Sequence, residues 1–133
     1  MLTDVIPYVE SHYSVKADRE HRALAGLSMG GGQLLNFGLS HLDTFAWVGG
    51  FSSAPNTRSA GDLIKDPAGA AKQLRLLWVS CGDQDRLMDT SRRFHEALEG
   101  MKVPHVWHVD TGGHTWPVWK NDLYLLAQRL FRD

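Results

Sequence analysis

The feature that constrains this chain most is the segment Gly26-Leu27-Ser28-Met29-Gly30, which matches the pattern Gly-x-Ser-x-Gly. In this pattern a serine occupies a sharp turn between a strand and a helix, so that its hydroxyl points away from the sheet. The turn brings backbone segments together, and we expect Gly26 and Gly30 to lie where a side chain would not fit. The first N–H groups of the helix, led by that of Met29, would then face a developing negative charge.

The residues around the motif bear on two interpretations of it. In the simpler one, Gly26 ends a strand and Ser28 caps a helix without any chemical role. However, residues 22–25 are mostly apolar, as in a buried parallel strand, and residues 33–39 have helical character that ends near Gly38. A strand, a turn and a helix therefore follow one another in the order that a nucleophilic serine requires.

The bulk properties are those of an ordinary globular protein. The chain has 133 residues, 43% of them hydrophobic and 22% charged, and we expect residues 1–133 to form a single domain. Its net charge of −1 gives no reason to expect nucleic acid or an acidic membrane as partner, and no apolar run reaches the roughly 18 residues of a membrane span. The lone Cys81 excludes an internal disulfide. Asp4 and Glu10 lie where a signal peptide would be basic and apolar, so we expect a soluble protein, either cytoplasmic or secreted.

Hydrophobic periodicity predicts alternating strands and helices along the whole chain. Strands are expected before Ser28 and over 45–52, 74–82 and 105–110, and helices over 2–13, 33–39, 67–73, 89–101 and 116–131. Thr3 is the expected N-cap of the first helix, and residues 54–66, rich in Pro, Asn, Gly and Ser, are expected to form a loop over the site. The alternation predicts an α/β fold with about four parallel strands and flanking helices. Ligands bind at the carboxyl ends of such strands.

Two further polar side chains follow strands whose carboxyl ends lie at the same edge as Ser28. A serine hydroxyl needs a base within hydrogen-bond reach, and the base needs an acceptor that holds its tautomer. Asp85 follows the third predicted strand, and His114, preceded by two glycines, follows the fourth. We therefore expect Asp85 and His114 to be the acid and the base. Asp83 is the alternative acid, and both aspartates could instead cap the next helix.

Several other residues are candidates for the surroundings of this site. Trp116 and Trp119 follow the histidine and could stack on an aromatic acyl group or a sugar, or they could pack on the sheet at the start of a helix. Ser53 is expected to line the mouth of the site, although turn chemistry explains it equally well. His105 and His108 have the spacing of residues on a strand, and without a second cluster of Cys or His we expect no metal site.

Several segments in register resemble the esterase D-like branch of the α/β-hydrolases, and especially its bacterial feruloyl and acetyl-xylan esterase domains. The segments are residues 26–33, 53–57, 81–85 and 112–120. The resemblance implies hydrolysis of carboxylic esters through an acyl-serine at Ser28, with the Met29 N–H in the oxyanion hole. It favours Asp85 over Asp83 as the partner of His114. It also implies a small-molecule or carbohydrate ester substrate, without cofactor or metal, and leaves the acyl group open because relatives include formylglutathione hydrolases and mycolyltransferases.

The position of Ser28 departs from the pattern of that family. There the serine follows four or five strands, whereas here one predicted helix and one strand precede it. The sequence is thus expected to hold the C-terminal portion of the domain, a truncated α/β-hydrolase fold without the usual N-terminal strands and without the second oxyanion donor. The strand before Ser28 would form a sheet edge, and we expect a second copy of the chain to cover it in a homodimer or larger oligomer, unless the sequence is a fragment of a longer protein. The alternative functions are an acyltransferase and an inactive binding or assembly module.

Overall fold

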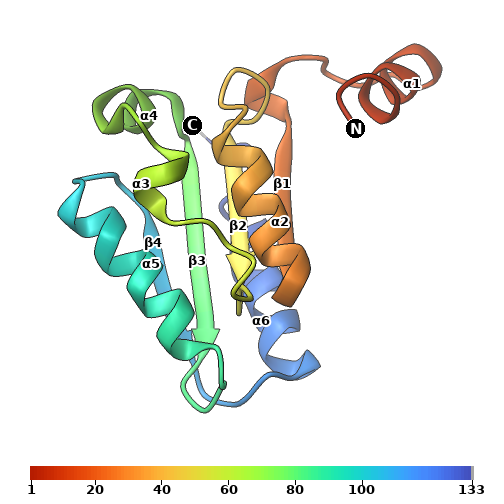
Figure 1. Ribbon diagram of the computed structural model, residues 1–133. Helices are drawn as coiled ribbons and strands as arrows, with labels where there is room; N and C mark the ends of the chain where they lie inside the picture. Colours follow the sequence, from red (N-terminus) through yellow and green to blue (C-terminus); the bar gives the residue numbers. More distant parts are fainter. Residues whose placement is uncertain (133) are drawn as a thin grey trace.

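The computed structural model of the chain describes residues 1–132 and contains a four-stranded sheet with helices on both faces (Figure 1). The strands lie in the order β1-β2-β3-β4 and comprise Ala23–Leu27, Trp47–Phe51, Leu76–Gly82 and Val106–Asp110. Each neighbouring pair is parallel. The predicted α/β fold with four parallel strands is therefore confirmed.

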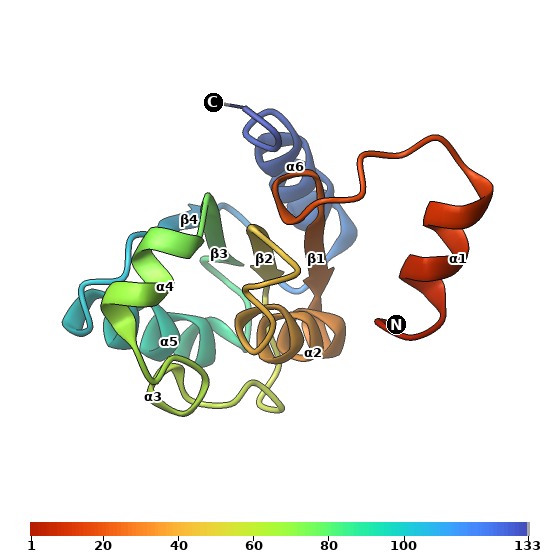
Figure 2. The same ribbon diagram turned by 90° about the horizontal axis from the view of Figure 1, so that it is seen from above.

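Helices connect the strands and cover both faces of the sheet. They are α1 (Val5–His12), the 3-10 turn η1 (Arg19–His21), α2 (Ser28–Leu39), α3 (Ala60–Leu63), α4 (Pro67–Gln73), α5 (Met88–Gly100) and α6 (Trp116–Ala127). Figure 2 shows α6 on one face of the sheet and α2 and α5 on the other, whereas α1 lies beyond the β1 edge. Within residues 1–132, no helix has the length and apolar character needed to cross a membrane.

Two apolar clusters join the helices to the sheet. The larger one includes side chains of α2 and α5 packed against inner strands, among them Leu35, Val48, Leu77, Phe94 and Leu98. The smaller one involves α6 and consists of buried Phe51, Trp78 and Leu126 with partly buried neighbours. Every residue of β2 is buried, as expected for an inner parallel strand that is covered on both faces.

The observed elements differ from the predicted ones mainly at their ends. The first helix begins at Val5, and Asp4 rather than Thr3 occupies its N-cap position, without a side-chain cap hydrogen bond. Residues 54–66 are not entirely a loop, because they contain α3, whose N-cap Ser59 accepts a hydrogen bond from the Asp62 N–H. The last helix ends at Ala127, before the predicted boundary at residue 131. These differences leave the predicted order of strands and helices intact.

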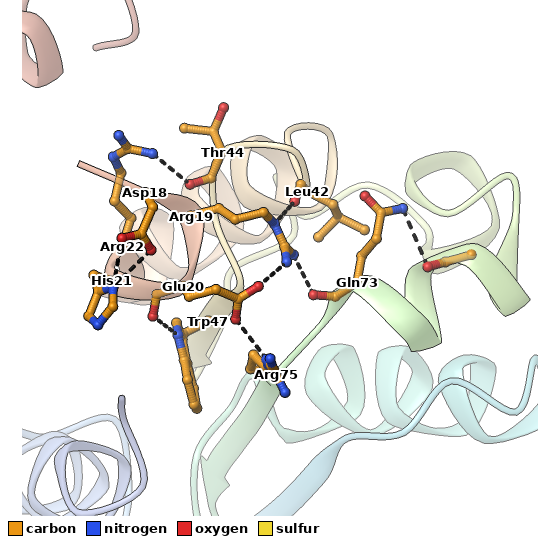
Figure 3. Close-up of polar contacts among 11 residues, drawn as sticks. Asp18, Arg19, Glu20, His21, Arg22, Leu42, Thr44, Trp47, Gln73 and Arg75 are labelled. Atoms are coloured by element: carbon orange, nitrogen blue, oxygen red, sulfur yellow. Dashed lines mark hydrogen bonds and ion pairs between the residues drawn. The ribbon is translucent and has the colours of Figure 1, made fainter. Parts of the chain in front are cut away.

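A polar network closes the amino end of the sheet (Figure 3). The Arg19 guanidinium contacts the Glu20 carboxylate and donates to the Gln73 carbonyl. Glu20 also accepts a hydrogen bond from Arg75 Nε at 2.7 Å, and its backbone carbonyl accepts one from the Trp47 indole at 2.8 Å. The network thereby joins η1, which leads into β1, to the residues at the start of β2 and β3.

Within the described part of the chain, β1 has a neighbouring strand on one side only. Its residues are all partly exposed, whereas those of β2 are buried. A hollow of about 590 Å³, lined largely by apolar side chains such as Val5, Val9 and Leu24, lies between α1 and this edge. The homo-oligomer expected here stays a prediction. Sedimentation velocity at micromolar concentration tests it, and a well-folded monomer would contradict it.

Candidate active site

Ser28 stands at the junction between β1 and α2. Its φ of 53° lies in the left-handed region, which non-glycine residues seldom adopt. Gly26 permits this turn, because a Cβ at this position would lie 2.8 Å from the backbone carbon of Gly30. The expectation for Gly30 was wrong, since a Cβ there would meet no atom within 4 Å. A side chain at Gly26 would therefore collide with the backbone of Gly30, whereas a side chain at Gly30 would have free space.

The imidazole of His114 lies between Ser28 and Asp85. Its Nε2 is 2.9 Å from Ser28 Oγ, and its Nδ1 is 2.8 Å from Asp85 Oδ2. An ionised carboxylate only accepts hydrogen bonds, so Nδ1 of His114 carries the proton. In the neutral ring Nε2 then has a free lone pair and accepts the hydrogen bond of the Ser28 hydroxyl. The structure thus brings together three predicted residues that follow the carboxyl ends of β1, β3 and β4.

Asp85 is held by several donors in a site without solvent access. Its side chain is 0% exposed, and its Oδ1 accepts a hydrogen bond from the Leu87 N–H at 2.8 Å. Burial acts to raise the pKa of Asp85, but the hydrogen bonds from the Leu87 N–H, the Ser52 hydroxyl and His114 outweigh it and lower that pKa. Asp85 is therefore ionised at neutral pH and faces the protonated nitrogen of His114.

Asp83, the alternative acid, fixes the loop that carries His114. Its Oδ1 accepts a hydrogen bond from the Gly112 N–H at 2.8 Å, and the Gln84 N–H donates to the Gly112 carbonyl at 2.9 Å. The two loops lie so close that a Cβ at Gly82 would be 2.2 Å from the Gly112 oxygen. Asp83 therefore joins the loops after β3 and β4, while Asp85 contacts the histidine.

Exposed apolar side chains flank the three residues. Met29 follows Ser28 at the start of α2, where the first N–H groups of a helix have no partner within the helix, and its side chain is 63% exposed. Trp116 begins α6 and is 64% exposed. Trp119 packs edge-on against His114, with ring centroids 4.7 Å apart, and against Trp116 at 6.3 Å. Trp119 therefore packs within the structure and also contacts His114, and its role toward a bound substrate stays a prediction.

Ser53 does not lie at the mouth of the site, contrary to expectation. It is buried, its Oγ has no hydrogen-bond partner, and a Cβ at Gly31 would lie 2.7 Å from that oxygen. The chain turns at Ser52, whose φ is 45°, so that Ser53 points toward α2. The sequence did not single out Ser52, whose hydroxyl accepts a hydrogen bond from the Trp119 indole at 3.1 Å, because adjacent serines carry no signal that distinguishes them.

His105, which precedes β4, and His108, within β4, have partners other than the three residues of this site. His105 Nε2 is 2.7 Å from His95 Nδ1, and its own Nδ1 donates to the Val103 carbonyl at 2.8 Å. His108 packs against Trp78, with ring centroids 5.5 Å apart. In the part of the chain that the structure describes, no three His, Cys, Asp or Glu side chains are grouped so as to hold a metal ion.

Comparison with known protein families extends this description. The model of the Esterase family matches residues 2–129. The chain belongs to the Esterase family. This finding agrees with the resemblance carried by the sequence motifs and with the arrangement of strands and helices.

Individual proteins are similar to this chain over nearly its whole length. The endo-1,4-beta-xylanase/feruloyl esterase of Xylanibacter ruminicola is 29% identical over 99% of this chain, which corresponds to 17% of that protein. A solved ferulic acid esterase is 30% identical, with a TM-score of 0.79, over 96% of this chain and 58% of its own. The CE1 ferulic acid esterase AmCE1/Fae1A of Anaeromyces mucronatus is 27% identical, with a TM-score of 0.79, over 98% of this chain and 51% of its own. The sequence therefore spans little more than half of these solved chains.

Proposed function

We propose that the protein is a serine carboxylesterase that hydrolyses esters of small or aromatic acids through an acyl-serine. The observation that carries this proposal is the series of hydrogen bonds from Ser28 through His114 to Asp85. Each donor and acceptor in the series has the direction that deprotonation of the serine requires. Membership in the Esterase family supports the same reaction class.

In the first half of the proposed reaction, Ser28 Oγ attacks the ester carbonyl carbon while its proton passes to His114 Nε2. A bond forms between Oγ and carbon, and the carbonyl electron pair moves to the oxygen, where the Met29 N–H stabilises the negative charge. Asp85 stabilises the imidazolium that forms at the same moment. The carbon then loses the alcohol, which leaves with the proton from His114, and the acyl group stays on Ser28.

In the second half, water takes the place of the alcohol. His114 Nε2 accepts a proton from water as its oxygen attacks the acyl carbon, and the oxyanion again faces the Met29 N–H. The second tetrahedral species collapses and releases the carboxylic acid, while Ser28 Oγ recovers its proton from His114. The cycle needs neither a metal nor a cofactor.

The aromatic side chains beside His114 support feruloyl or acetyl esters of plant-cell-wall carbohydrates as the substrate class. The Trp119 ring packs against His114 and the exposed Trp116 ring packs against Trp119, and aromatic rings stack well on phenolic acids and sugar faces. The names of the similar proteins, ferulic acid esterase and xylanase/feruloyl esterase, point to the same class. Ser53 is no longer part of the proposed binding site because it is buried.

Turnover of p-nitrophenyl acetate tests this function. Ser28→Ala should lower kcat/KM by at least about 10⁴-fold, because the nucleophile is lost. The matched control is Ser11→Ala, which changes an exposed serine on α1 and should keep kcat/KM within about twofold of the unmodified chain. A fluorophosphonate probe should label the chain and fail to label Ser28→Ala, since the probe phosphonylates an activated serine oxygen and releases fluoride.

The same assay separates the remaining alternatives. Addition of glycerol yields a glyceryl ester in excess over the free acid if the protein is an acyltransferase. Neither turnover nor labelling by the probe is the outcome expected of an inactive binding or assembly module, and this outcome would overturn the proposed function.

A further inference from the structure

The indole ring of Trp119 lies against the imidazole of His114. The two ring centroids are 4.7 Å apart, and the ring planes are nearly perpendicular, at 87°. The side chain of His114 is 20% exposed, so burial alone does not hold its orientation. The hydrogen bonds to Ser28 and Asp85 fix its two nitrogens, and a ring packed edge-on limits tilting of the imidazole about the line between them.

The Trp119 ring is itself fixed by a hydrogen bond. Its Nε1 donates to Ser52 Oγ at 3.1 Å, and the indole has no other hydrogen-bonding group. Ser52 is 0% exposed, so bulk water does not compete for this acceptor. Because hydrogen bonds are directional, the contact sets the orientation of the indole.

Ser52 is a rigid point of attachment for this ring. It directly follows β2, its φ of 45° turns the chain out of the strand, and its N–H donates to the Ser80 carbonyl of β3 at 2.7 Å. Its Oγ is also 3.8 Å from the Sγ of Cys81, a buried thiol on β3. The position of the Ser52 hydroxyl is therefore defined by the two inner strands of the sheet.

We propose that Trp119 is a positioning residue, which holds the imidazole of His114 in its working orientation and is held in turn by the buried hydroxyl of Ser52. The inference rests on the function proposed above. The contacts form a continuous path from the inner strands to the base, because Ser52 follows β2, Trp119 lies in the first turn of α6, and His114 precedes that helix.

This role differs from stacking on a bound substrate. A contact that orients the base acts on the chemical step, so its loss lowers kcat by a similar factor for every acyl group. Lost stacking instead raises KM, and raises it most for an aromatic ester. The two roles of Trp119 are therefore separated by comparing methyl acetate with methyl ferulate.

Two substitutions remove the hydrogen bond from opposite sides. Trp119→Phe keeps an aromatic ring without the N–H, and Ser52→Ala removes the acceptor. Each should lower kcat about 3- to 10-fold for both methyl esters, with KM within about twofold, because the base is less well oriented. A loss confined to methyl ferulate, or a change in KM alone, would overturn the proposal.

The matched control is Ser53→Ala. The neighbouring serine is also buried, and within residues 1–132 its Oγ has no hydrogen-bond partner. This variant should keep kcat for both esters within about twofold of the unmodified chain. A loss equal to that of Ser52→Ala would overturn the proposal, because any change of a buried serine at this place would then have the same effect.

A double-mutant cycle tests whether Ser52 and Trp119 act as one unit. In the Trp119→Phe background the Ser52 hydroxyl has no indole N–H to accept, so Ser52→Ala should lower kcat there by less than about twofold. A loss in that background as large as in the unmodified chain would overturn the proposal, because the Ser52 hydroxyl would then act through another group.

Nuclear magnetic resonance tests the same contacts without any turnover. The indole N–H of Trp119, assigned by its absence in Trp119→Phe, should exchange with solvent at least about tenfold more slowly than that of Trp116, which is 64% exposed. The ring nitrogen signals of His114 should shift in Ser52→Ala and stay in place in Ser53→Ala. The exchange comparison uses the unmodified chain and therefore applies even if Ser52→Ala does not fold.

These signals separate failure of the inference from failure of the proposed function. If the protein shows neither turnover nor probe labelling, the proposed function fails, while a slowly exchanging Trp119 N–H and responsive His114 signals still support the positioning contacts. Equal exchange at the two indoles, or His114 signals unchanged by loss of the Ser52 hydroxyl, would overturn the inference even where the esterase activity is present.

Discussion

Two buried aspartates near β3 have opposite acid–base properties. Asp85 follows the strand and Asp122 lies on α6, with whole-residue exposures of 5% and 0%. Asp85 accepts hydrogen bonds from the Leu87 N–H and His114, whereas neither oxygen of Asp122 makes a hydrogen bond. The pKa of Asp85 is lowered despite burial, while burial raises the pKa of Asp122 to about 7, although the nearby Ser80 hydroxyl opposes the rise.

The contrast shows that the hydrogen-bond donors around a buried carboxyl group, rather than the extent of its burial, decide whether the group is ionised. Burial disfavours the charged form of both groups, and only hydrogen bonds or opposite charges reverse that effect. Asp85 is ionised at neutral pH and can stabilise a charged imidazole. Asp122 exchanges its proton near neutrality and makes stability depend on pH.

The largest expected effect on activity is that of Asp85→Asn, and Asp122→Asn, made separately, is its matched comparison. Asp85→Asn should lower kcat/KM for p-nitrophenyl acetate by about 10⁴-fold, because the amide no longer holds the tautomer of His114 that accepts a proton from Ser28. Asp122→Asn should change kcat/KM by less than about threefold at pH 6. Equal losses in the two variants would break the comparison, since Asp122 would then act in the reaction.

For the pH dependence of stability, by contrast, Asp122 is expected to matter more than Asp85. A folded-state pKa of about 7 for Asp122 means that its contribution is fully present below the unfolded pKa near 3.8 and is lost as pH rises toward 7. Between pH 5 and pH 8 the unmodified chain should lose about 2.5 kcal/mol of unfolding free energy that Asp122→Asn does not lose. Urea unfolding at both pH values measures this difference, and parallel pH profiles of the two proteins would contradict it.

Two exposed aromatic residues of α6 allow a similar comparison, because one lies near the site and the other serves as a control. Trp116 and Tyr124 lie on α6 and are both 64% exposed, but Trp116 packs against Trp119, which in turn contacts His114. Trp116→Ala should lower kcat/KM for methyl ferulate about tenfold and that for methyl acetate less than threefold, because stacking on the phenolic ring is lost. The matched control Tyr124→Ala should affect neither substrate. A uniform loss for both esters would remove Trp116 from the proposed acyl-binding site.

The smallest effect is expected at a carboxylate that has partners but lies at the surface. Glu20 accepts from Arg75 at 2.7 Å and contacts Arg19 at the amino end of the sheet, and the hydrogen bond from Arg75 lowers its pKa. Glu20→Gln should lower Tm by only about 2 °C at low salt, and the difference should shrink at 1 M NaCl, because exposed ion pairs are screened. A salt-independent loss, read by calorimetry, would show that this network is a structural element of the fold.

The sequence alone predicted the fold class and placed Ser28, Asp85 and His114 at the ends of different strands. These predictions succeeded because apolar runs define parallel strands, and parallel strands place their carboxyl ends at one edge. The choice between Asp83 and Asp85 required the structure, in which Asp83 contacts Gly112 and Asp85 contacts the histidine.

Other features depend on tertiary contacts that no local pattern contains. Ser53, which was expected to line the mouth of the site, is buried because the chain turns at Ser52 at the end of β2. The environment of Asp122 arises because α6 turns this residue toward β3 across the sheet face, and in the sequence it stands in an ordinary amphipathic helix. The short helix α3 was missed because its N-cap Ser59 lies in a segment whose composition favours a loop.

The strand order also makes the reactivity of Ser28 a measure of folding. Ser28 follows β1 and His114 follows β4, and these strands form the two opposite edges of the sheet. In a folding intermediate with either edge strand undocked, only one of the two residues would be in its native place. The hydroxyl and the imidazole would then not meet. Time-resolved labelling during refolding would therefore report when the last strand docks, and would do so from a single hydroxyl group.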